Sequence, residues 1–302
     1  SRLETLSKLP SLKSGIVITT LETLSQRLCP KNYIEIYSLH LKTKQNLEIK
    51  SFSENLIKIG YRRVTTVMEQ GEFCIKGALI DLYPMGTKNP YRIDLFDNEI
   101  DSIRSFDTSS QRSIEIIKEI KLLPAREFAT DSDSISIFKD NYLSEFGNTD
   151  GFIYNEVSEG RYPGGIEFYL PLFFKTTETL FDYILGEPVI FYQKGLNEAM
   201  ELQAKELLER FEYCKGSLER LPLEINKVFL NTERFFKKLS DKKQVQIQSS
   251  KIEKEEGYNF SSSILPPLKI EAQTKKPLNK LIKFIENFDG QVLIVCESEG
   301  RQ

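Results

Sequence analysis

The chain has 302 residues, of which 40% are hydrophobic and 28% are charged, and its formal net charge is −3. This length allows two or three domains with separate cores, and the composition is that of an ordinary soluble globular protein. A slightly acidic chain argues against a nucleic-acid surface spread over the whole protein, because such a surface is basic, but it does not exclude a local basic patch.

Cysteine and histidine usage predicts no metal site. His40 is the single histidine, and the cysteines are far apart in the chain, at Cys29, Cys74, Cys214 and Cys296. No Cys/His zinc pattern follows from this spacing. Free cysteines suit a reducing compartment, and we find neither a signal peptide nor an apolar run long enough to span a bilayer. We therefore expect a cytoplasmic protein without a membrane segment.

The first segment predicts an α/β layer. Residues 1–9 favour a short helix, GIVITT (15–20) favours a buried strand because it is rich in β-branched residues, and LETLSQRL (21–28) favours a helix that Pro30 ends. The opening SRLETLSKLP has no initiator Met, and the closing GQVLIVCESEGRQ reads as a strand and an unfinished turn. We therefore expect both ends to be cuts in a longer protein.

Residues 31–123 predict a compact α+β unit inserted between α/β segments. YIEIYSLHL (33–41) alternates and favours a strand, and SFSENLIKIG (51–60) favours a helix capped by Ser51 or Ser53 and ended at Gly60. The stretches that follow favour strands around a PMGTKNP turn: YRRVTTV, EFCIKGALIDLYP, YRIDLF, DNEIDSIRSFD and SIEIIKEIKLLP. In the fourth of these, Ile100, Ile103 and Phe106 are expected core anchors.

The remainder mixes helices and short strands. Residues 131–146 and 196–215 have helical spacing, and the second run is expected to bury Leu196, Met200, Leu207 and Phe211. Short strands are expected over 188–193 and 225–230. The polar stretch 251–263 is a predicted linker, and 277–295 is a predicted helix–strand pair that opens another domain.

Motifs for catalysis or phosphate binding are not evident. Neither the P-loop pattern nor G-x-G-x-x-G occurs, and the glycine pair of YPGGIEFYLP is interpreted as a tight turn before a strand. His40, in an alternating stretch, is interpreted as a structural or solvent-facing histidine. RFFKKLSDKK (234–243) is interpreted as a helix with a solvated basic face rather than a DNA groove. We expect no catalytic, cofactor-binding or metal-binding residue.

One strand carries an unusual face. Side chains alternate along a strand, so in YRIDLF the residues Arg92, Asp94 and Phe96 share a face, and Ile93 and Leu95 point to the other, which suits a core. A mixed face of this kind is more often plain solvated surface, although arginine and aromatic residues also anchor protein interfaces. If the PMGTKNP turn closes an antiparallel hairpin without a bulge, Lys76 joins this face.

The segment GYRRVTTVMEQGEFCIKGALIDLYPMGTKNPYRIDLFDNEIDSIRSFDTSSQRS, followed by LLPAREF, resembles the N-terminal, UvrB-like region of the bacterial transcription-repair coupling factor (Mfd) family. LSKLPSLKSGIVITTLETLSQRLCP, GIEFYLPLFF and IENFDGQVLIVCESEGR are similar to its neighbouring segments, so the resemblance covers nearly the whole chain. The same central block resembles the excision-repair protein UvrB more distantly.

The resemblance implies an α/β fold, a UvrB-like module. A degenerate α/β domain made of parts 1A (1–37) and 1B (124–250) would carry an inserted α+β domain 2 (38–123). A linker (251–263) and the start of a further α/β domain (264–302) would follow.

The resemblance also implies a function. Domain 2 would bind UvrA, with Lys76, Arg92 and Phe96 at family docking positions and, by comparison with UvrB, Arg63 and Asp94 as well. The chain would be a non-catalytic module that recruits UvrA to DNA damage at stalled RNA polymerase in nucleotide excision repair. Two positions depart from the family pattern. Lys76 stands where arginine is usual and lacks the planar guanidinium group that makes bidentate contacts. Cys74 stands where UvrB-type proteins have an arginine, so a contact there is not ionic.

Other readings stay open. The chain could instead be part of a UvrB-like ATP-dependent damage-verification protein, or, less favoured by its charge, a nucleic-acid-binding domain. For the full-length proteins, the resemblance implies an ATP-dependent DNA translocase whose motor domains use ATP and Mg. Parts outside this chain would contact RNA polymerase and DNA, and a C-terminal domain would mask the UvrA face. We expect no enzyme activity and no cofactor in this chain.

Overall fold

The computed structural model describes residues 2–217, 220–253, 257–268 and 276–294, and the chain divides into two compact units, Ser1–Ile247 and Gln248–Gln302. Within those described ranges, no helix is both long and apolar enough to cross a membrane.

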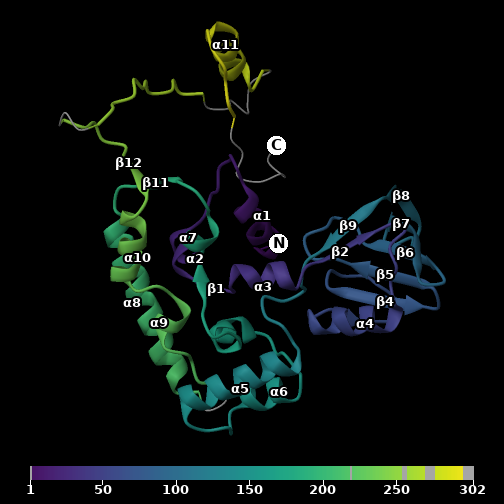
Figure 1. Ribbon diagram of the computed structural model, residues 1–302. Helices are drawn as coiled ribbons and strands as arrows, with labels where there is room; N and C mark the ends of the chain where they lie inside the picture. The colour runs from purple at the N-terminus through teal and green to yellow at the C-terminus, as the bar shows by residue number, and fades with distance from the viewer. Residues whose placement is uncertain (1, 218–219, 254–256, 269–275, 295–302) are drawn as a thin grey trace. The chain divides into compact units, whose positions relative to one another are not determined.

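A six-stranded sheet forms one part of the first unit (Figure 1). Its strands follow chain order, β3 to β8, and all neighbours are antiparallel except the parallel pair β3 and β4. They are β3 (Arg62–Arg63), β4 (Glu72–Lys76), β5 (Leu79–Tyr83), β6 (Tyr91–Phe96), β7 (Glu99–Phe106) and β8 (Ser113–Ile117). EFCIKGALIDLYP thus holds two strands, and Gly77 between them has a φ of +62°, a conformation that glycine adopts without strain.

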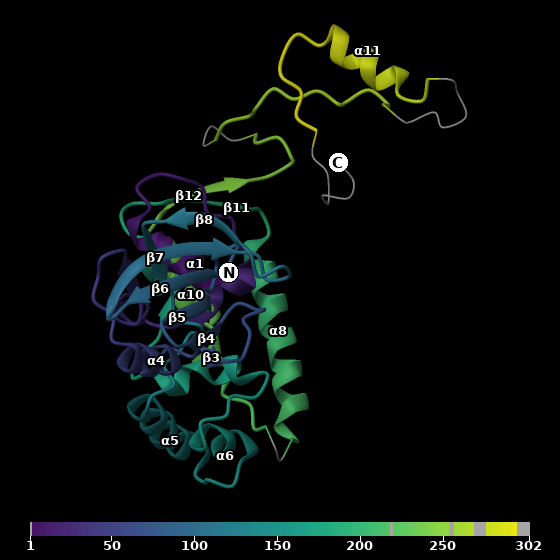
Figure 2. The same cartoon turned by 90° about the vertical axis from the view of Figure 1, so that its right-hand side faces the viewer.

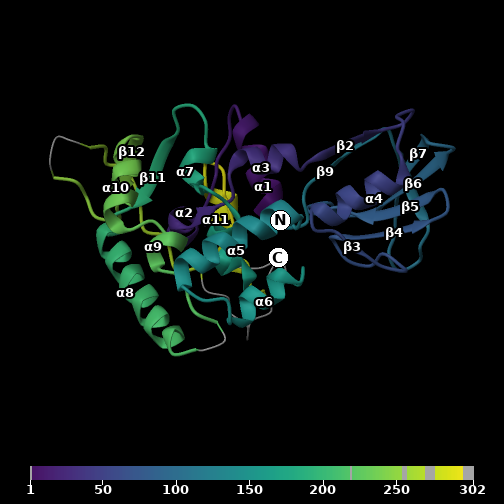
Figure 3. The same cartoon turned by 60° about the horizontal axis from the view of Figure 1, so that its bottom comes forward.

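Helix α4 (Ile49–Lys58) lies along one face of this sheet (Figure 3). Its Phe52 and Leu56 pack with the strand residues Ile80, Ile93 and Ile103 in one core. The antiparallel pair β2 (Leu39–Lys42) and β9 (Glu119–Leu122) contributes Leu41, Ile120 and Leu122 to the same core. The expected anchors Ile100, Ile103 and Phe106 are all fully buried.

Helices of different lengths, among them the long helix α8 (Leu196–Lys215), and two small sheets make up the rest of this unit (Figure 2). Strand β1 (Arg27–Leu28) pairs antiparallel with β10 (Glu178–Thr179), and β11 (Val189–Gln193) pairs parallel with β12 (Lys243–Ile247). The helices before the six-stranded sheet are α1 (Arg2–Lys8), η1 (Leu9–Ser11), α2 (Leu21–Ser25) and α3 (Lys31–Ile36). Those after it are α5 (Ser132–Phe146), α6 (Phe152–Ser158), η2 (Ile166–Phe173), α7 (Leu180–Tyr183), α8 (Leu196–Lys215), α9 (Ile225–Val228) and α10 (Thr232–Ser240).

The segments before and after the inserted sheet share a core. Leu3, Leu28 and Tyr33 from the first segment pack with Leu180 and Tyr183 from the second. The Tyr183 hydroxyl donates to the Cys29 carbonyl oxygen over 2.8 Å, and burial raises the pKa of the Cys29 thiol to about 12. The chain therefore leaves this α/β part, forms the sheet and returns to it. The exact domain boundaries at 37, 123 and 250 stay predictions.

Asp131 ties three helices together where the chain returns. Its side chain caps α5 by accepting from the Ser134 amide at 2.9 Å, and it also accepts from the Tyr37 hydroxyl at 3.1 Å. The ammonium of Lys58, at the end of α4, lies 3.2 Å from the same carboxylate. Burial alone raises the pKa of Asp131, but these hydrogen bonds outweigh it, so its pKa lies below the ordinary value.

Several expectations for the first 60 residues were wrong. Residues 15–20 form no strand, and Ile16 and Ile18 are 90% and 92% exposed, because no strand of the described residues pairs with them. The helix expected over 21–28 ends at Ser25, since Arg27 and Leu28 pair with β10 instead. Residues Lys31–Ile36 are helical rather than extended, with strand β2 beginning only at Leu39. The cap of α4 is Glu48 rather than a serine, while Gly60 ends the helix region with a positive φ as expected.

Later expectations were mixed. Residues 113–124 form two strands in different sheets, 225–230 contains the helical turn α9, and the glycine pair precedes the 3-10 helix η2 rather than a strand. Helices α5, α8 and α10 and strand β11 were correctly predicted, but of the four α8 residues expected in the core only Met200 is fully buried. Strand β12 was missed. His40 faces solvent, 3.8 Å from the Glu119 carboxylate.

The second unit contains one helix in its described part. Helix α11 (Asn279–Asn287) fits the predicted helix, but residues 291–294 form no strand, and residue 295 lies outside the described residues. The described residues of the predicted linker, 251–253 and 257–263, contain neither helix nor strand.

The packing of α4 on the core predicts that substitutions at two neighbouring residues of this helix have different effects on stability. Leu56 is fully buried and Ile57 is exposed. Leu56→Ala should lower the free energy of unfolding by about 2–5 kcal/mol, because it leaves a cavity in the core, whereas Ile57→Ala should change it by less than about 0.5 kcal/mol. Urea unfolding followed by circular dichroism measures both. Equal effects of the two substitutions would contradict this packing.

Asp131 predicts a pH-dependent stability difference. Asp131→Ala should lower the free energy of unfolding by about 1–2 kcal/mol at pH 7, because the α5 cap and the contact with Lys58 disappear. The pKa of Asp131 is lower in the folded protein than in the unfolded chain, where it is about 4. Its ionised carboxylate therefore stabilises the fold above about pH 4, and this stabilisation is lost as the pH falls through the folded-state pKa. The gap between wild type and variant in urea unfolding should therefore shrink below about pH 4. A gap that widens on acidification would contradict this.

Candidate protein-binding face

The face of the six-stranded sheet opposite α4 carries four of the five predicted binding residues, Lys76, Arg92, Asp94 and Phe96. Along β6, Ile93 and Leu95 are buried in the core under α4, Arg92 and Asp94 are half-buried, and Phe96 is 74% exposed. The expectation that Arg92, Asp94 and Phe96 share the non-core face is therefore confirmed. Phe96 projects into solvent at the end of a central strand.

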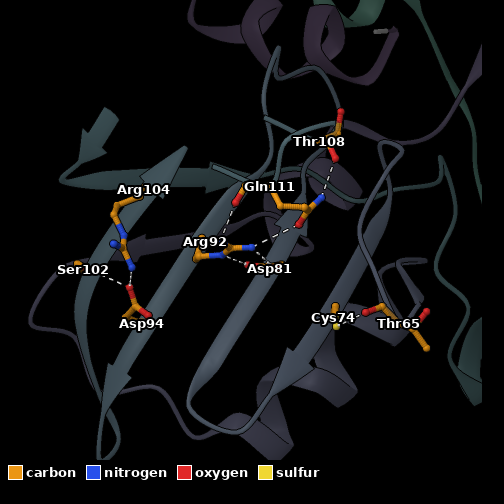
Figure 4. Close-up of polar contacts among 9 residues, drawn as sticks. All are labelled: Thr65, Cys74, Asp81, Arg92, Asp94, Ser102, Arg104, Thr108 and Gln111. Carbon is orange, nitrogen blue, oxygen red and sulfur yellow. Dashed lines mark hydrogen bonds and ion pairs between the residues drawn. The ribbon is translucent and has the colours of Figure 1, made fainter. Parts of the chain in front are cut away.

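Arg92 is held within the sheet by Asp81 of β5, its cross-strand neighbour (Figure 4). Arg92 Nε donates to Asp81 Oδ1 at 2.7 Å and Nη2 donates to Oδ2 at 2.9 Å, and the Gln111 carbonyl oxygen accepts from Nη1 at 3.2 Å. The guanidinium also lies 4.7 Å from the centre of the Phe106 ring. The hydrogen bonds with Asp81 raise the pKa of Arg92. With the side chains 19% and 7% exposed, this pair is largely shielded from water.

Asp94 is held in a second charged contact. Arg104 of β7 forms an ion pair with its carboxylate, and the Ser102 hydroxyl donates to it at 3.1 Å (Figure 4). A bulge lies beside this contact, since Asp94 is opposite Ser102 while Leu95 is opposite Ile100. The bulge adds a residue to β7 and leaves the alternation along β6 intact.

Lys76 joins the same face, as expected. The pairing of β5 with β6 has no bulge, and Lys76 is opposite Leu79, which is opposite Asp94. The Lys76 side chain is exposed and forms no ion pair with any residue that the structure describes. It therefore presents a positive charge on the same face as the Asp94 contact, two strands away across the sheet.

Arg63 and Cys74 do not join Arg92 at the exposed part of the face. Arg63 is exposed on the short edge strand β3, and its register partner is Phe73, a residue of the core side. Cys74 lies in the same cross-strand row as Asp81 and Arg92 but is buried, and its thiol donates to the Thr65 carbonyl oxygen at 3.2 Å. The structure thus separates Arg63 from the other four predicted residues.

Sequence reasoning missed three residues of this face. Asp81 and Arg104 are the ionic partners described above, and Ile116 of β8 lies opposite Arg104 and is 79% exposed. The partners depend on register, which a single sequence does not provide. Ile116 had a local signal, because isoleucines two apart in SIEII lie on one side of a strand. Phe96 of β6 and both Ile114 and Ile116 of β8 are large exposed apolar side chains of this sheet.

Elsewhere in the described ranges, no group of three His, Cys, Asp or Glu side chains is arranged to hold a metal ion. The face itself offers the paired arginines Arg92 and Arg104, the exposed Lys76, and exposed apolar side chains that include Phe96 and Ile116. Such a set can recognise another protein surface through an apolar contact surrounded by polar groups.

Comparison with known proteins gives two kinds of match. Residues 39–128 match the UvrB interaction domain family. The whole chain is 39% identical to the transcription-repair-coupling factor of Escherichia coli K12 and 38% identical to that of Haemophilus influenzae Rd, and it covers 27% of each relative. The corresponding protein of Rickettsia bellii is 34% identical over 76% of the chain and 20% of its own length. The chain therefore spans between a fifth and little more than a quarter of the length of these curated relatives.

The buried ion pair predicts that Arg92 is a poor single-residue probe of binding. Arg92→Ala leaves the Asp81 carboxylate without its partner and should lower stability by about 2 kcal/mol, between the values for exposed and buried pairs. The double variant Asp81→Asn, Arg92→Gln should recover part of this loss, because no uncompensated charge remains. Urea unfolding of Arg92→Ala measures the loss, and urea unfolding of Asp81→Asn, of Arg92→Gln and of their double variant measures the coupling. Strictly additive losses would show that the pair is energetically unimportant.

Proposed function

Because the chain is a UvrB-like region of the transcription-repair coupling factor family, we propose that it is a non-catalytic module that binds UvrA through the sheet face described above. In this proposal the chain brings UvrA to DNA damage at a stalled RNA polymerase, as a step of nucleotide excision repair. The match to the UvrB interaction domain, over the residues that form the sheet, supports a protein-binding role.

The exposed ring of Phe96 is the observation that carries the proposal. A phenylalanine that is 74% exposed on a central strand leaves a large apolar surface in water. Burying an aromatic side chain at the centre of an interface is a common source of binding energy. The strand that carries Phe96 is fixed by the core beneath it and by the Asp94 contact beside it, so little ordering is needed on binding.

The predicted residues then take different roles. Phe96 and Lys76 would contact UvrA, with Ile116 extending the apolar area. Arg92 and Asp94 would mainly position the face, because their charges are already paired within the sheet. Arg63 stays a proposed contact, but only for a partner that also reaches the β3 edge.

The alternative, an ATP-dependent damage-verification fragment related to UvrB, is less well supported by this face, which offers apolar and paired charged groups for binding. ATP and Mg, RNA polymerase, DNA and masking by a C-terminal domain stay predictions about the full-length protein. We propose no catalytic step and no cofactor for this chain.

The proposal predicts a specific loss of binding. Phe96→Ala should weaken binding of UvrA by about 2 kcal/mol, roughly 30-fold, while Phe168→Ala should leave it unchanged. Phe168 is a matched control, because it is 62% exposed and lies in η2, outside the sheet. Lys76→Ala should cause a smaller loss that decreases as salt is added.

The measurement is a calorimetric titration of the chain with purified UvrA, with the fold of each variant checked by circular dichroism. Equal losses in both phenylalanine variants would move the binding surface away from β6. A folded wild-type chain that does not bind UvrA at all would refute the recruitment role.

A further inference from the structure

A cationic pocket lies outside the inserted sheet. It has a volume of about 580 Å³ and is formed by β1, β10, the start of α3 and α7, and helix α10. Five cationic side chains line it: Arg27, Lys31, Arg234, Lys237 and Lys238. They come from two segments about 200 residues apart in the chain, so the pocket exists only in the folded protein.

The two cations from the first segment are fixed by neutral groups. Arg27 Nε donates to the Asn226 carbonyl oxygen at 3.0 Å, and Nη1 donates to the Thr177 hydroxyl at 3.4 Å. Lys31 Nζ donates to the carbonyl oxygen of Asp182 at 2.7 Å. These contacts orient both side chains, and neither Arg27 nor Lys31 forms an ion pair with a carboxylate of the described residues.

Carboxylates in the pocket compensate only part of this charge. Asp182 pairs with Lys238 Nζ at 2.7 Å and also accepts from the Thr179 amide, and Glu178 accepts from the Lys31 amide at 3.0 Å. Asp241 is the third carboxylate of the lining. Arg234 and Lys237, both exposed on α10, form no ion pair with the described residues. The pocket lining therefore contains more positive than negative side chains, although the net charge of the whole chain is −3.

The arrangement is electrostatically unfavourable while the pocket holds only protein groups. Partial burial, and then the charge of Arg234, lower the pKa of Arg27. An anion between the two guanidinium groups would replace the lost hydration and reduce their repulsion. Guanidinium groups bind phosphate oxygens in a bidentate manner, and ammonium groups add charge without fixed geometry.

We propose that this pocket binds phosphate groups, supplied either by the backbone of a DNA duplex or by a small polyphosphate. Arg27 and Arg234 would hold phosphate oxygens, and Lys31 and Lys237 would add attraction at the sides of the pocket. The volume lies within the range of natural small-molecule sites, about 300–1,000 Å³. All four residues lie outside 39–128, so this site is independent of the proposed UvrA face.

Two probes distinguish the two phosphate sources. A fluorescein-labelled duplex of about 20 base pairs, followed by anisotropy, tests for backbone binding, and inorganic pyrophosphate, followed by calorimetry, tests for a small polyanion. The double variant Arg234→Gln, Lys237→Gln removes two exposed charges that have no ion pair, so it should fold normally. Lys50→Gln is the control, because Lys50 is an exposed lysine on α4.

Binding of either probe by the wild type, weakened at least about ten-fold in the double variant and unchanged in Lys50→Gln, would support the site. For the duplex, the double variant should also reduce the dependence of log affinity on log salt by about 1–2. Absence of binding for both probes, or equal binding by the wild type and the double variant, would overturn the proposal. Neither result depends on whether the chain binds UvrA.

Discussion

The packing of α4 on one face of the six-stranded sheet is the constraint on which the rest of the inserted unit depends. Because strand side chains alternate, burying Ile80, Ile93 and Ile103 under α4 directs Asp81, Arg92 and Arg104 to the other face. Charged groups on that face need partners where neighbouring side chains shield them from water. The register supplies them, with Asp81 opposite Arg92 and Arg104 bonded to Asp94.

This ionic network separates residues that hold the face from residues that are free to contact a partner. Arg92 and Asp94 have their charges matched within the sheet, so an incoming protein gains little from pairing with them again. Phe96, Ile116 and Lys76 have no such partner among the residues described. An interface built on a fixed strand with a few free anchors loses little conformational entropy on binding. In the proposed interface, Arg92 and Asp94 would therefore hold the face in place, while Phe96 of the same strand would contact the partner.

The α/β part supports a second surface in a different way. Its core joins the segment before the insert to the segment after it, and the hydrogen bond from the Tyr183 hydroxyl to the Cys29 carbonyl oxygen crosses between them. The same closure brings Arg27 and Lys31 next to α10 and creates the cationic pocket. Asp131 links this part to the end of α4. The inserted sheet and the pocket are thus made by different segments, so the two proposed binding surfaces share no residue.

The sequence by itself determined the features that depend on neighbouring residues. The alternation along YRIDLF assigned Arg92, Asp94 and Phe96 to one face, and helical spacing located α5, α8 and α10. Only the tertiary structure decided the features that depend on distant residues. GIVITT pairs with no strand of the described residues and stays exposed, and residues 33–36 are helical although YIEIYSLHL (33–41) alternates. Asp81, Arg104 and the basic pocket were likewise beyond sequence reasoning. The physical reason is that periodicity is local, whereas register, burial and ionic partners arise when segments far apart in the chain pack together.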